Sequence, residues 1–329
     1  MLQWLINSWY HPQPIRWILW PFSLFYQFVL KLRNGLFRLT ILKQHYLPVP
    51  VIIVGNITIG GTGKTPFVIW LAKQLKQAGY RPGIISRGYG GHAAHYPQSV
   101  MPDSDPVVVG DEPIIISRHS LCPMVVAPDR VAAGKRLLKE HDCNVIIADD
   151  GLQHYALGRD IEIVIIDGQR QFGNRLCLPA GPLREPMSRL NQVDFIVENK
   201  GLNTINYTMT LSQLDAVNLI DRTQKRALSS FKGQTIHAIA GIGNPQRFFD
   251  QLSSQGLSLI SHIFDDHHPF IAEDIQFNDQ KAILMTEKDA VKCQHFVDNN
   301  AWYIPIEASI SGKLDQHILQ KLAGITPHG

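Results

Sequence analysis

The feature that most constrains the fold is a glycine-rich run, Asn56-Ile-Thr-Ile-Gly-Gly-Thr-Gly-Lys-Thr65, placed between two apolar segments. The segment before it, Val51–Val54, is a short continuous apolar run that predicts a buried parallel strand. The segment after it, Pro66–Leu75, has apolar residues at helical spacing. A strand, a glycine-rich loop and a helix in this order cradle phosphates, because backbone N–H groups and the helix dipole hold anionic oxygens. The run therefore predicts a nucleotide-binding α/β domain.

The residues of this loop have separate expected roles. Lys64 is expected to reach the outer phosphates of a nucleoside triphosphate, and the Thr65 hydroxyl to ligate magnesium. The backbone cradle is formed by Thr58, Ile59, Gly60, Gly61, Thr62 and Gly63. The usual pattern has a glycine five residues before Gly63, where this chain has Thr58. A flexible turn that happens to contain Gly-Lys-Thr is the alternative, but the flanking strand and helix favour nucleotide binding.

Charge is distributed unevenly along the 329 residues. Ten basic residues and no acidic residue precede Asp103, whereas the remainder has 21 basic and 28 acidic residues. A basic front end indicates an anionic partner, which is nucleic acid, anionic lipid or a phosphorylated substrate. With 45% hydrophobic residues the chain can bury a sizeable core, and its length predicts two domains.

The segment Trp17–Leu30 favours lipid among these partners. It is apolar and aromatic, is 14 residues long with Pro21 interrupting it, and has Arg16, Lys31 and Arg33 at its ends. It is short for a hydrocarbon core of ~30 Å, and its composition is typical of a helix lying in a membrane interface. A signal peptide is disfavoured because no small-residue cleavage site follows, and a helix packed on the protein's own core remains the alternative. RNA binding is disfavoured because the aromatic residues cluster with aliphatic ones.

Cysteine usage indicates where the body of the protein resides. The four cysteines are scattered and form no C-x-x-C pair. This argues against a zinc site or a disulfide framework and fits a reducing compartment. We therefore expect a peripheral membrane anchor with the protein body in the cytoplasm.

The remaining pattern predicts a doubly wound, mostly parallel sheet and a second, smaller α/β unit, because apolar strand-like runs alternate with helical patterns. Asp129 is the expected cap of a helix that ends near His141. We expect a membrane-associating segment over 1–48, a P-loop domain over 49–205, a connection over 206–233 and the smaller domain over 234–329. Whether the last twenty residues return to the first domain is left open. The expected strands are 83–86, 124–127, 144–148, 161–166, 193–197, 207–211, 216–220, 236–240, 282–286 and 302–305.

Two short motifs contain aspartates at the ends of predicted structural elements. Asp149 and Asp150 end a buried strand-like run, where a carboxylate near a P-loop would hold magnesium; a cap or turn before Gly151 is the alternative. Asp111 lies in Gly110-Asp-Glu-Pro113 at a loop-to-helix junction, where it would cap the helix or have a chemical role.

Two loops place arginines where they could contact phosphate. Ser86-Arg-Gly-Tyr-Gly-Gly91 puts Arg87 and Tyr89 on a glycine-rich loop after a strand, and arginine suits bidentate contact with phosphate. The proline-rich run Leu178–Pro186 contains Arg184 and Glu185, an adjacent charge pair that suits a ligand role. A solvated turn and a rigid turn are the respective alternatives.

The loop Phe264-Asp-Asp-His-His-Pro-Phe270 gathers two carboxylates and two imidazoles. Adjacent histidines are poorly spaced for shared metal ligation, so an Asp–His pair for proton transfer is the stronger functional hypothesis. A polar loop without a role is the alternative.

Taken together, these segments resemble the tetraacyldisaccharide 4'-kinase family, the lipid A 4'-kinases of Gram-negative bacteria. The resemblance covers nearly the whole chain, and in this family threonine is ordinary at the position of Thr58. The motifs occur in the family's order. After the hydrophobic, basic amino end they are Val54–Pro66, Ser86–Gly90, Gly110–Pro113, Asp149–His154, Pro179–Pro186, Phe264–His268 and Thr286–Asp289.

The resemblance implies transfer of the ATP γ-phosphoryl group to the 4'-hydroxyl of a tetraacyldisaccharide 1-phosphate at the cytoplasmic face of the inner membrane. It implies Asp111 as the catalytic acid-base residue, with His267 as its partner and His268 as the alternative. It also implies magnesium held by Thr65, by Asp149 or Asp150, and by Glu185, and substrate contacts for Arg87, Tyr89 and Arg184. No nucleic acid and no obligate protein partner are expected.

Two other functions compete with this one. A membrane-associated ATPase switch would have a signature lysine before its Gly-Gly pair, where this chain has Ile59. A soluble small-molecule kinase would not need the segment Trp17–Leu30. The kinase of an acylated sugar accounts for both the P-loop and the amino-terminal segment.

Overall fold

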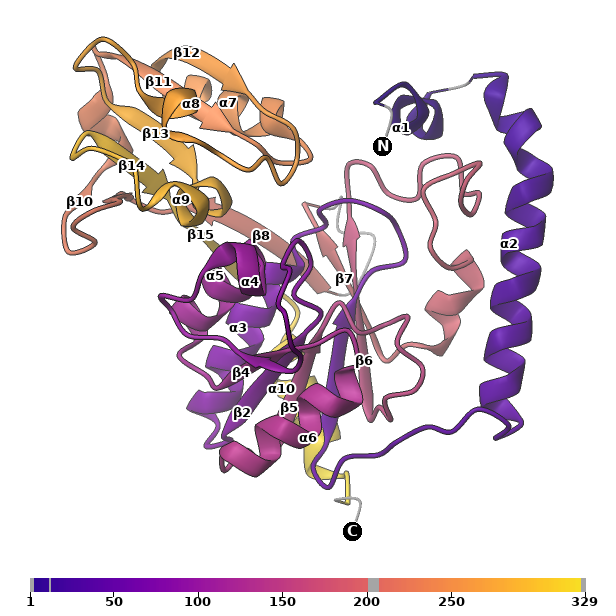
Figure 1. Ribbon diagram of the computed structural model, residues 1–329. Helices are drawn as coiled ribbons and strands as arrows, with labels where there is room; N and C mark the ends of the chain where they lie inside the picture. Colours follow the sequence, from indigo (N-terminus) through magenta and orange to yellow (C-terminus); the bar gives the residue numbers. More distant parts are fainter. Residues whose placement is uncertain (1–2, 12, 201–206, 327–329) are drawn as a thin grey trace.

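The computed structural model describes residues 3–11, 13–200 and 207–326, which form a nine-stranded and a six-stranded sheet (Figure 1). The nine-stranded sheet has the order β15-β8-β7-β6-β1-β5-β2-β4-β3. In that order the strands are Ile306–Ile310, Tyr207–Gln213, Phe195–Asn199, Ile161–Asp167, Val51–Gly55, Val145–Asp149, Pro82–Ser86, Met124–Val126 and Gln98–Ser99. The strands from β8 to β4 are parallel, and the edge strands β15 and β3 are antiparallel. The mostly parallel α/β sheet predicted from the sequence is confirmed.

Helices cover both faces of this sheet because its central strands are apolar on both sides. In β1, Ile52 and Val54 pack in the cluster shared with α3 (Lys64–Gln77), α5 (Asp111–Ser120) and α10 (Leu314–Ala323). Val51 and Ile53 point to the opposite cluster, which includes α6 (Arg130–Glu140). Asp129 caps α6 as predicted, since its side chain accepts hydrogen bonds from two backbone N–H groups. The short helix α4 (Pro106–Val109) and a 3₁₀-helix (Met187–Gln192) complete this domain.

The amino-terminal segment forms α1 (Gln3–Tyr10) and the 24-residue α2 (Ile15–Arg38), which runs along the flank of the first domain (Figure 1). Our expectation that Pro21 interrupts the segment is wrong, because α2 continues through it. A proline removes one backbone hydrogen bond, and the turns on either side keep theirs. No helix in the described part of the chain is both long enough and apolar enough to cross a membrane.

The second sheet forms the smaller domain and has the order β10-β9-β14-β13-β11-β12. In that order its strands are Lys225–Arg226, Ala216–Asn218, Ala301–Ile304, Ile283–Thr286, Thr235–Ala240 and Ser258–Ile263. Its helices are α7 (Pro245–Ser254), α8 (Ala272–Ile275), α9 (Glu287–Cys293) and a 3₁₀-helix (Leu228–Phe231).

The segment expected to connect the domains contributes strands to both. β8 pairs with β7 in the first sheet, and β9 pairs with β14 in the second. The chain then returns, because β15 pairs with β8 and α10 packs against α3. The expected boundary between 205 and 206 lies outside the described residues.

Candidate active site

The loop between β1 and α3 has the geometry of a phosphate cradle. Gly60 and Gly63 adopt φ angles of 101° and 95°, a left-handed region that a side chain disfavours. The Lys64 ammonium lies 3.2 Å from Oδ1 of Asn56 and 3.4 Å from Oδ1 of Asp150. The neighbouring strand end supports the loop, because the Asn199 amide donates to the Thr62 carbonyl at 3.0 Å. Lys64 is therefore held at the mouth of the loop.

Asp149 and Asp150 lie at the end of β5, beside the loop, but differ in protonation. The Oδ2 atom of Asp149 accepts a hydrogen bond from the Ser86 hydroxyl at 2.9 Å, while its Oδ1 is buried without a partner among the described residues. Burial, with the charges of Glu112 and Asp150, raises the pKa of Asp149 to about 7. Burial opposes ionisation of Asp150 too, but Lys64 and Arg184 outweigh it and lower the pKa of Asp150 to about 2.

The buried Oδ1 of Asp149, which has no hydrogen-bond partner among the described residues, indicates whether the site suits a cation. A buried carboxylate oxygen without a donor costs free energy that a bound cation would remove. Thr65, at the start of α3, is also buried. No three His, Cys, Asp or Glu side chains of the described residues converge as a metal cage. Mg²⁺ is usually bound by one or two carboxylates together with phosphate oxygens, so these residues fit it.

Asp111 and His267 come together from the two domains. Asp111 is the first residue of α5 and is 5% exposed, and its Oδ1 accepts from the Glu112 N–H at 2.8 Å. Its Oδ2 lies 3.3 Å from Nδ1 of His267. Burial opposes ionisation of Asp111, but His267 and the Lys288 ammonium outweigh it and lower the pKa of Asp111. The hydrogen bond to Asp111 raises the pKa of His267.

The structure distinguishes the two adjacent histidines. His268 Nε2 lies 2.8 Å from Oδ2 of Asp274 within the smaller domain. His267 instead points to the first domain, where the ring of Tyr89 lies edge-on at 5.1 Å between centroids. Glu112 follows Asp111 and is close enough to raise the pKa of Asp149. The Asp111–His267 pair therefore neighbours the carboxylates beside the phosphate cradle.

The remaining predicted residues are divided between this site and its surroundings. Arg184 lies 3.1 Å from Asp150 and joins the carboxylate cluster. Arg87 follows β2 and is exposed, as is Tyr89. Glu185 is buried with Tyr155 and Arg189, and the contacts of the described residues do not join it to Asp149. Its Oε1 has no partner there, and burial raises its pKa, so it too suits a nearby cation.

Residues that the sequence analysis did not single out complete the site. Ser86 and Asn56 hold Asp149 and Lys64, and each follows or ends a strand at the same sheet edge. Lys288 forms an ion pair with Glu112 across the two domains. The motif Thr286–Asp289 contains this lysine, but mixed charge in a short motif does not reveal a partner far along the chain.

The amino-terminal helices are attached to the loop that contains Arg184. The indole N–H of Trp9 donates to the Pro179 carbonyl at 3.0 Å, and the Ser23 hydroxyl donates to the Cys177 carbonyl at 2.8 Å. The Tyr26 hydroxyl donates to the carbonyl of Arg184 itself at 2.9 Å. One face of α2 therefore supports the candidate site.

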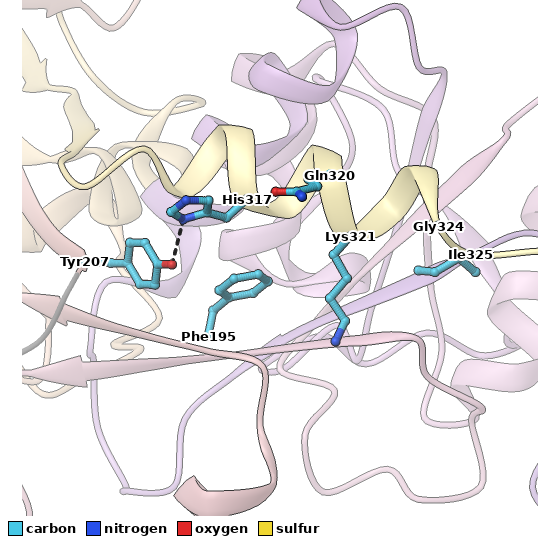
Figure 2. Close-up of a pocket in the computed structure, with 7 residues that line it drawn as sticks. All are labelled: Phe195, Tyr207, His317, Gln320, Lys321, Gly324 and Ile325. Carbon is cyan, nitrogen blue, oxygen red and sulfur yellow. Dashed lines mark hydrogen bonds between the residues drawn. The ribbon is translucent and has the colours of Figure 1, made fainter.

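An open cavity of about 700 Å³ lies elsewhere, between α10 and the strands β7 and β8 (Figure 2). Its lining includes Phe195, Lys321 and the hydrogen-bonded pair Tyr207 and His317, whose Oη and Nδ1 atoms are 2.8 Å apart. None of its lining residues belongs to the predicted site, so this cavity is separate from the candidate active site at the P-loop.

Comparison with known proteins agrees with this geometry. The model of the tetraacyldisaccharide-1-P 4'-kinase family matches residues 15–323. The chain belongs to this family. It is 52% identical to the tetraacyldisaccharide 4'-kinase of Nitrosococcus oceani over 97% of this chain and 94% of that protein. It is 50% identical to the kinase of the same name from Methylobacillus flagellatus, over 97% and 96% of the two chains.

A solved structure has the same fold. The crystal structure described as the "apo" form of LpxK from Aquifex aeolicus in complex with ATP superposes with a TM-score of 0.78 at 28% identity. The match covers 94% of this chain and 99% of that one. The kinase function expected from the sequence is confirmed by the family match.

Proposed function

We propose that this family member transfers the γ-phosphoryl group of ATP to the 4'-hydroxyl of a tetraacyldisaccharide 1-phosphate, with Asp111 as the general base. The observation that carries the assignment of Asp111 is its contact with His267 beside the phosphate cradle. The ATP named for the Aquifex aeolicus structure and the substrate named for the relatives support the choice of substrates.

The nucleotide would lie in the loop Thr58–Thr65, with Lys64 on its outer phosphates. Magnesium would be held by Thr65, Asp149 and Asp150, with Glu185 as a further ligand, and would offset charge on the phosphates. Lys64 and Arg184, which pair with Asp150, would keep that carboxylate ionised and therefore ready to bind a cation.

The acceptor step uses the pair that the two domains assemble. Asp111 takes the proton of the 4'-hydroxyl. At the same time the hydroxyl oxygen forms the new bond to the γ-phosphorus, and the bond between this phosphorus and the ADP oxygen breaks. His267 holds and orients Asp111 through Nδ1, and in its protonated form favours the carboxylate. Arg87 and Tyr89, both exposed on the loop after β2, are the proposed substrate contacts on this side.

The division into domains supports protection of the transferred group from water. His267 belongs to the smaller domain and Asp111 to the P-loop domain, so the pair depends on the two domains being closed on each other, and this closure would also exclude water from the transferred group. The P-loop domain of this proposal spans residues from 49 through β8, together with β15 and α10.

The outer face of α2 supports action at a membrane surface. Trp17, Phe25 and Phe28 are 64%, 68% and 61% exposed, whereas Ser23 on the opposite side is fully buried. An exposed aromatic stripe next to basic residues favours binding in the headgroup region, and residues 1–48 would thus serve as a peripheral anchor. Four buried cysteines without disulfide bonds and the use of ATP fit the cytoplasmic face of the inner membrane of a bacterium.

One assay tests the proposal directly. The purified protein is incubated with γ-labelled ATP, magnesium and the disaccharide 1-phosphate in mixed micelles, and the lipid product is analysed. Label on the 4' position of the second sugar is expected. Release of free phosphate without labelled lipid would favour the ATPase switch and would overturn the proposal.

A further inference from the structure

The contact between α5 and α9 combines a buried apolar cluster with polar pairs, and one of these pairs includes the residue after Asp111. Lys288 forms an ion pair with Glu112, and His119 Nε2 lies 2.7 Å from Oε1 of Glu287. At the other end of α9, Nη2 of Arg118 in the last turn of α5 donates to the Gln294 side chain at 2.9 Å. Within the first turn of α9, Glu287 therefore contacts the last turn of α5, whereas Lys288 reaches the first turn of α5, where Asp111 is located.

The start of α9 is held rigidly by buried hydrogen bonds. Thr286 caps the helix, since its side chain accepts from the Asp289 N–H. Asp289 is fully buried, accepts from the Gly241 N–H at 3.0 Å and lies 3.2 Å from the Lys292 ammonium. Lys288 leaves this rigid turn and extends to the other domain, so its position is fixed by the smaller domain.

The charges around Asp111 give Lys288 a consequence beyond domain contact. Asp111 is faced by His267 and by the ammonium groups of Lys288 and Lys292, with Glu112 beside it. His267 is faced by Asp111, Asp266 and Lys288. Both lysines are paired, Lys288 with Glu112 and Lys292 with buried Asp289, and of the two Lys288 lowers the pKa of Asp111 more.

We propose that Lys288 is a positioning residue that keeps Asp111 ionised and in contact with His267 when the two domains meet. The inference rests on the proposed function, since it assigns Lys288 a role toward the proposed base. It predicts that the lysine acts through its charge, and not only by joining two helices.

Removal of the charge should move two titrations in the same direction. A cation near Asp111 favours the carboxylate, and a cation near His267 disfavours the imidazolium. Loss of Lys288 therefore raises the pKa of both groups, so the whole pH profile of kcat shifts to higher pH. A shift of one unit corresponds to a tenfold change in the ionised fraction on the acid side. We expect kcat of Lys288→Met to fall by about tenfold or more on that limb.

The test measures kcat and KM for both substrates across the pH range in Lys288→Met, Lys288→Arg and wild-type protein. The C–H resonances of the His267 ring, assigned with His267→Asn, are titrated in parallel without substrate. Lys288→Met should shift both limbs of the kcat–pH profile to higher pH and raise the pKa of the His267 ring. Lys288→Arg should restore the wild-type values. Lys281→Met is the matched control, because Lys281 pairs with Asp279 within the smaller domain.

Glu112→Gln separates charge from docking, because it neutralises the partner of Lys288 and leaves the ammonium in place. Glu112→Gln should leave both limbs of the kcat–pH profile unchanged or shift them to lower pH. If Glu112→Gln instead reproduces the effect of Lys288→Met, or if Lys288→Met leaves both titrations unchanged, the inference is overturned. Should Lys288→Met fail to fold, Lys288→Gln takes its place in the same measurements. Asp111→Asn tests the proposed base separately. Full activity of Asp111→Asn would overturn the proposed function. If Asp111→Asn is inactive but Lys288→Met has the pH profile of the wild type, only the inference about Lys288 is overturned.

Discussion

The Nδ1 atom of His267 lies 3.3 Å from Oδ2 of Asp111, although Asp111 begins a helix of the P-loop domain and His267 lies in a loop of the smaller domain. Neither domain alone contains the pair. Its geometry therefore depends on how the smaller domain sits on α5, and variants of the pair and variants of the domain contact should affect the same step.

Replacement of Asp111 should slow the chemical step. We expect Asp111→Asn to lower kcat by about 10²–10⁴-fold, the usual range for loss of a general base, with little change in KM for ATP. Steady-state kinetics with both substrates check this. Asp105→Asn is a suitable control, because Asp105 caps the neighbouring helix α4 and is not part of the pair. A decrease of less than about threefold would leave Asp111 as a residue of the α5 N-terminus with no part in proton transfer.

Lys64 should be needed for turnover but not for folding. Lys64→Ala removes the ammonium from the phosphate cradle, and we expect kcat to decrease by at least about 10²-fold while the circular dichroism spectrum is retained. Lys73→Ala, on the exposed side of the same helix, is the control. Normal turnover by Lys64→Ala would contradict the assignment of the loop.

Asp149 should make stability depend on pH. Its pKa rises from 3.8 to about 7 on folding, so the folded protein retains a proton that the unfolded chain has lost. Asp149 therefore destabilises the fold increasingly as pH rises from about 4 to about 7. Without nucleotide or metal, Asp149→Asn should raise Tm more at pH 8 than at pH 5. Exposed Asp142→Asn is the control. A difference in Tm that does not vary with pH would show that Asp149 is not protonated in the folded state.

The outer face of α2 should determine membrane binding. Phe25→Ser combined with Phe28→Ser leaves Ser23 and Tyr26 intact and should release the protein from vesicles of bacterial lipid in a sedimentation assay. Val107→Ser removes an apolar side chain that is 66% exposed elsewhere and should have no effect. Deletion of residues 1–32 should also release the protein. Unchanged sedimentation of both variants would favour a helix that only packs on the protein core.

The hydroxyl of Tyr26 should affect catalysis through the position of Arg184. Tyr26→Phe loses a hydrogen bond to the Arg184 carbonyl. A bond of this kind contributes about 1 kcal/mol to the placement of its partner, so we expect kcat to fall by up to about fivefold. Tyr46→Phe, which removes an exposed hydroxyl that donates to nearby Gln44, is the control. Equal kinetics of wild type and Tyr26→Phe would separate α2 from the function of Arg184.

Local patterns of the sequence predicted the parts of the site that lie close together in the chain. The loop before Lys64 and the carboxylates after β5 follow short buried strands, so their place at one sheet edge follows from parallel pairing. The choice of His267 over His268 needed the structure, because neighbouring residues in a loop point in directions that spacing does not specify. The partner of Lys288 also needed it, because Glu112 lies in the other domain.

The amino-terminal prediction failed at one residue for a different reason. Pro21 signals a break in an isolated segment, but α2 continues because the turns around it are stabilised by tertiary contacts such as that of Ser23. The strand β15 was not predicted, and the return of only the last twenty residues was left open, because an antiparallel edge strand has no periodicity that identifies its neighbour.

The attachment of α2 fixes the distance of the Arg184 loop from a surface that the helix contacts. Ser23 and Tyr26 bind the loop on one side of the helix, and Phe25 and Phe28 project from the other. The thickness of one helix, about 10 Å, therefore separates the Arg184 loop from any surface on which α2 rests. The headgroup of an acylated sugar would reach the Arg184 loop only if it extended about this far from the surface, whatever the length of the acyl chains below it.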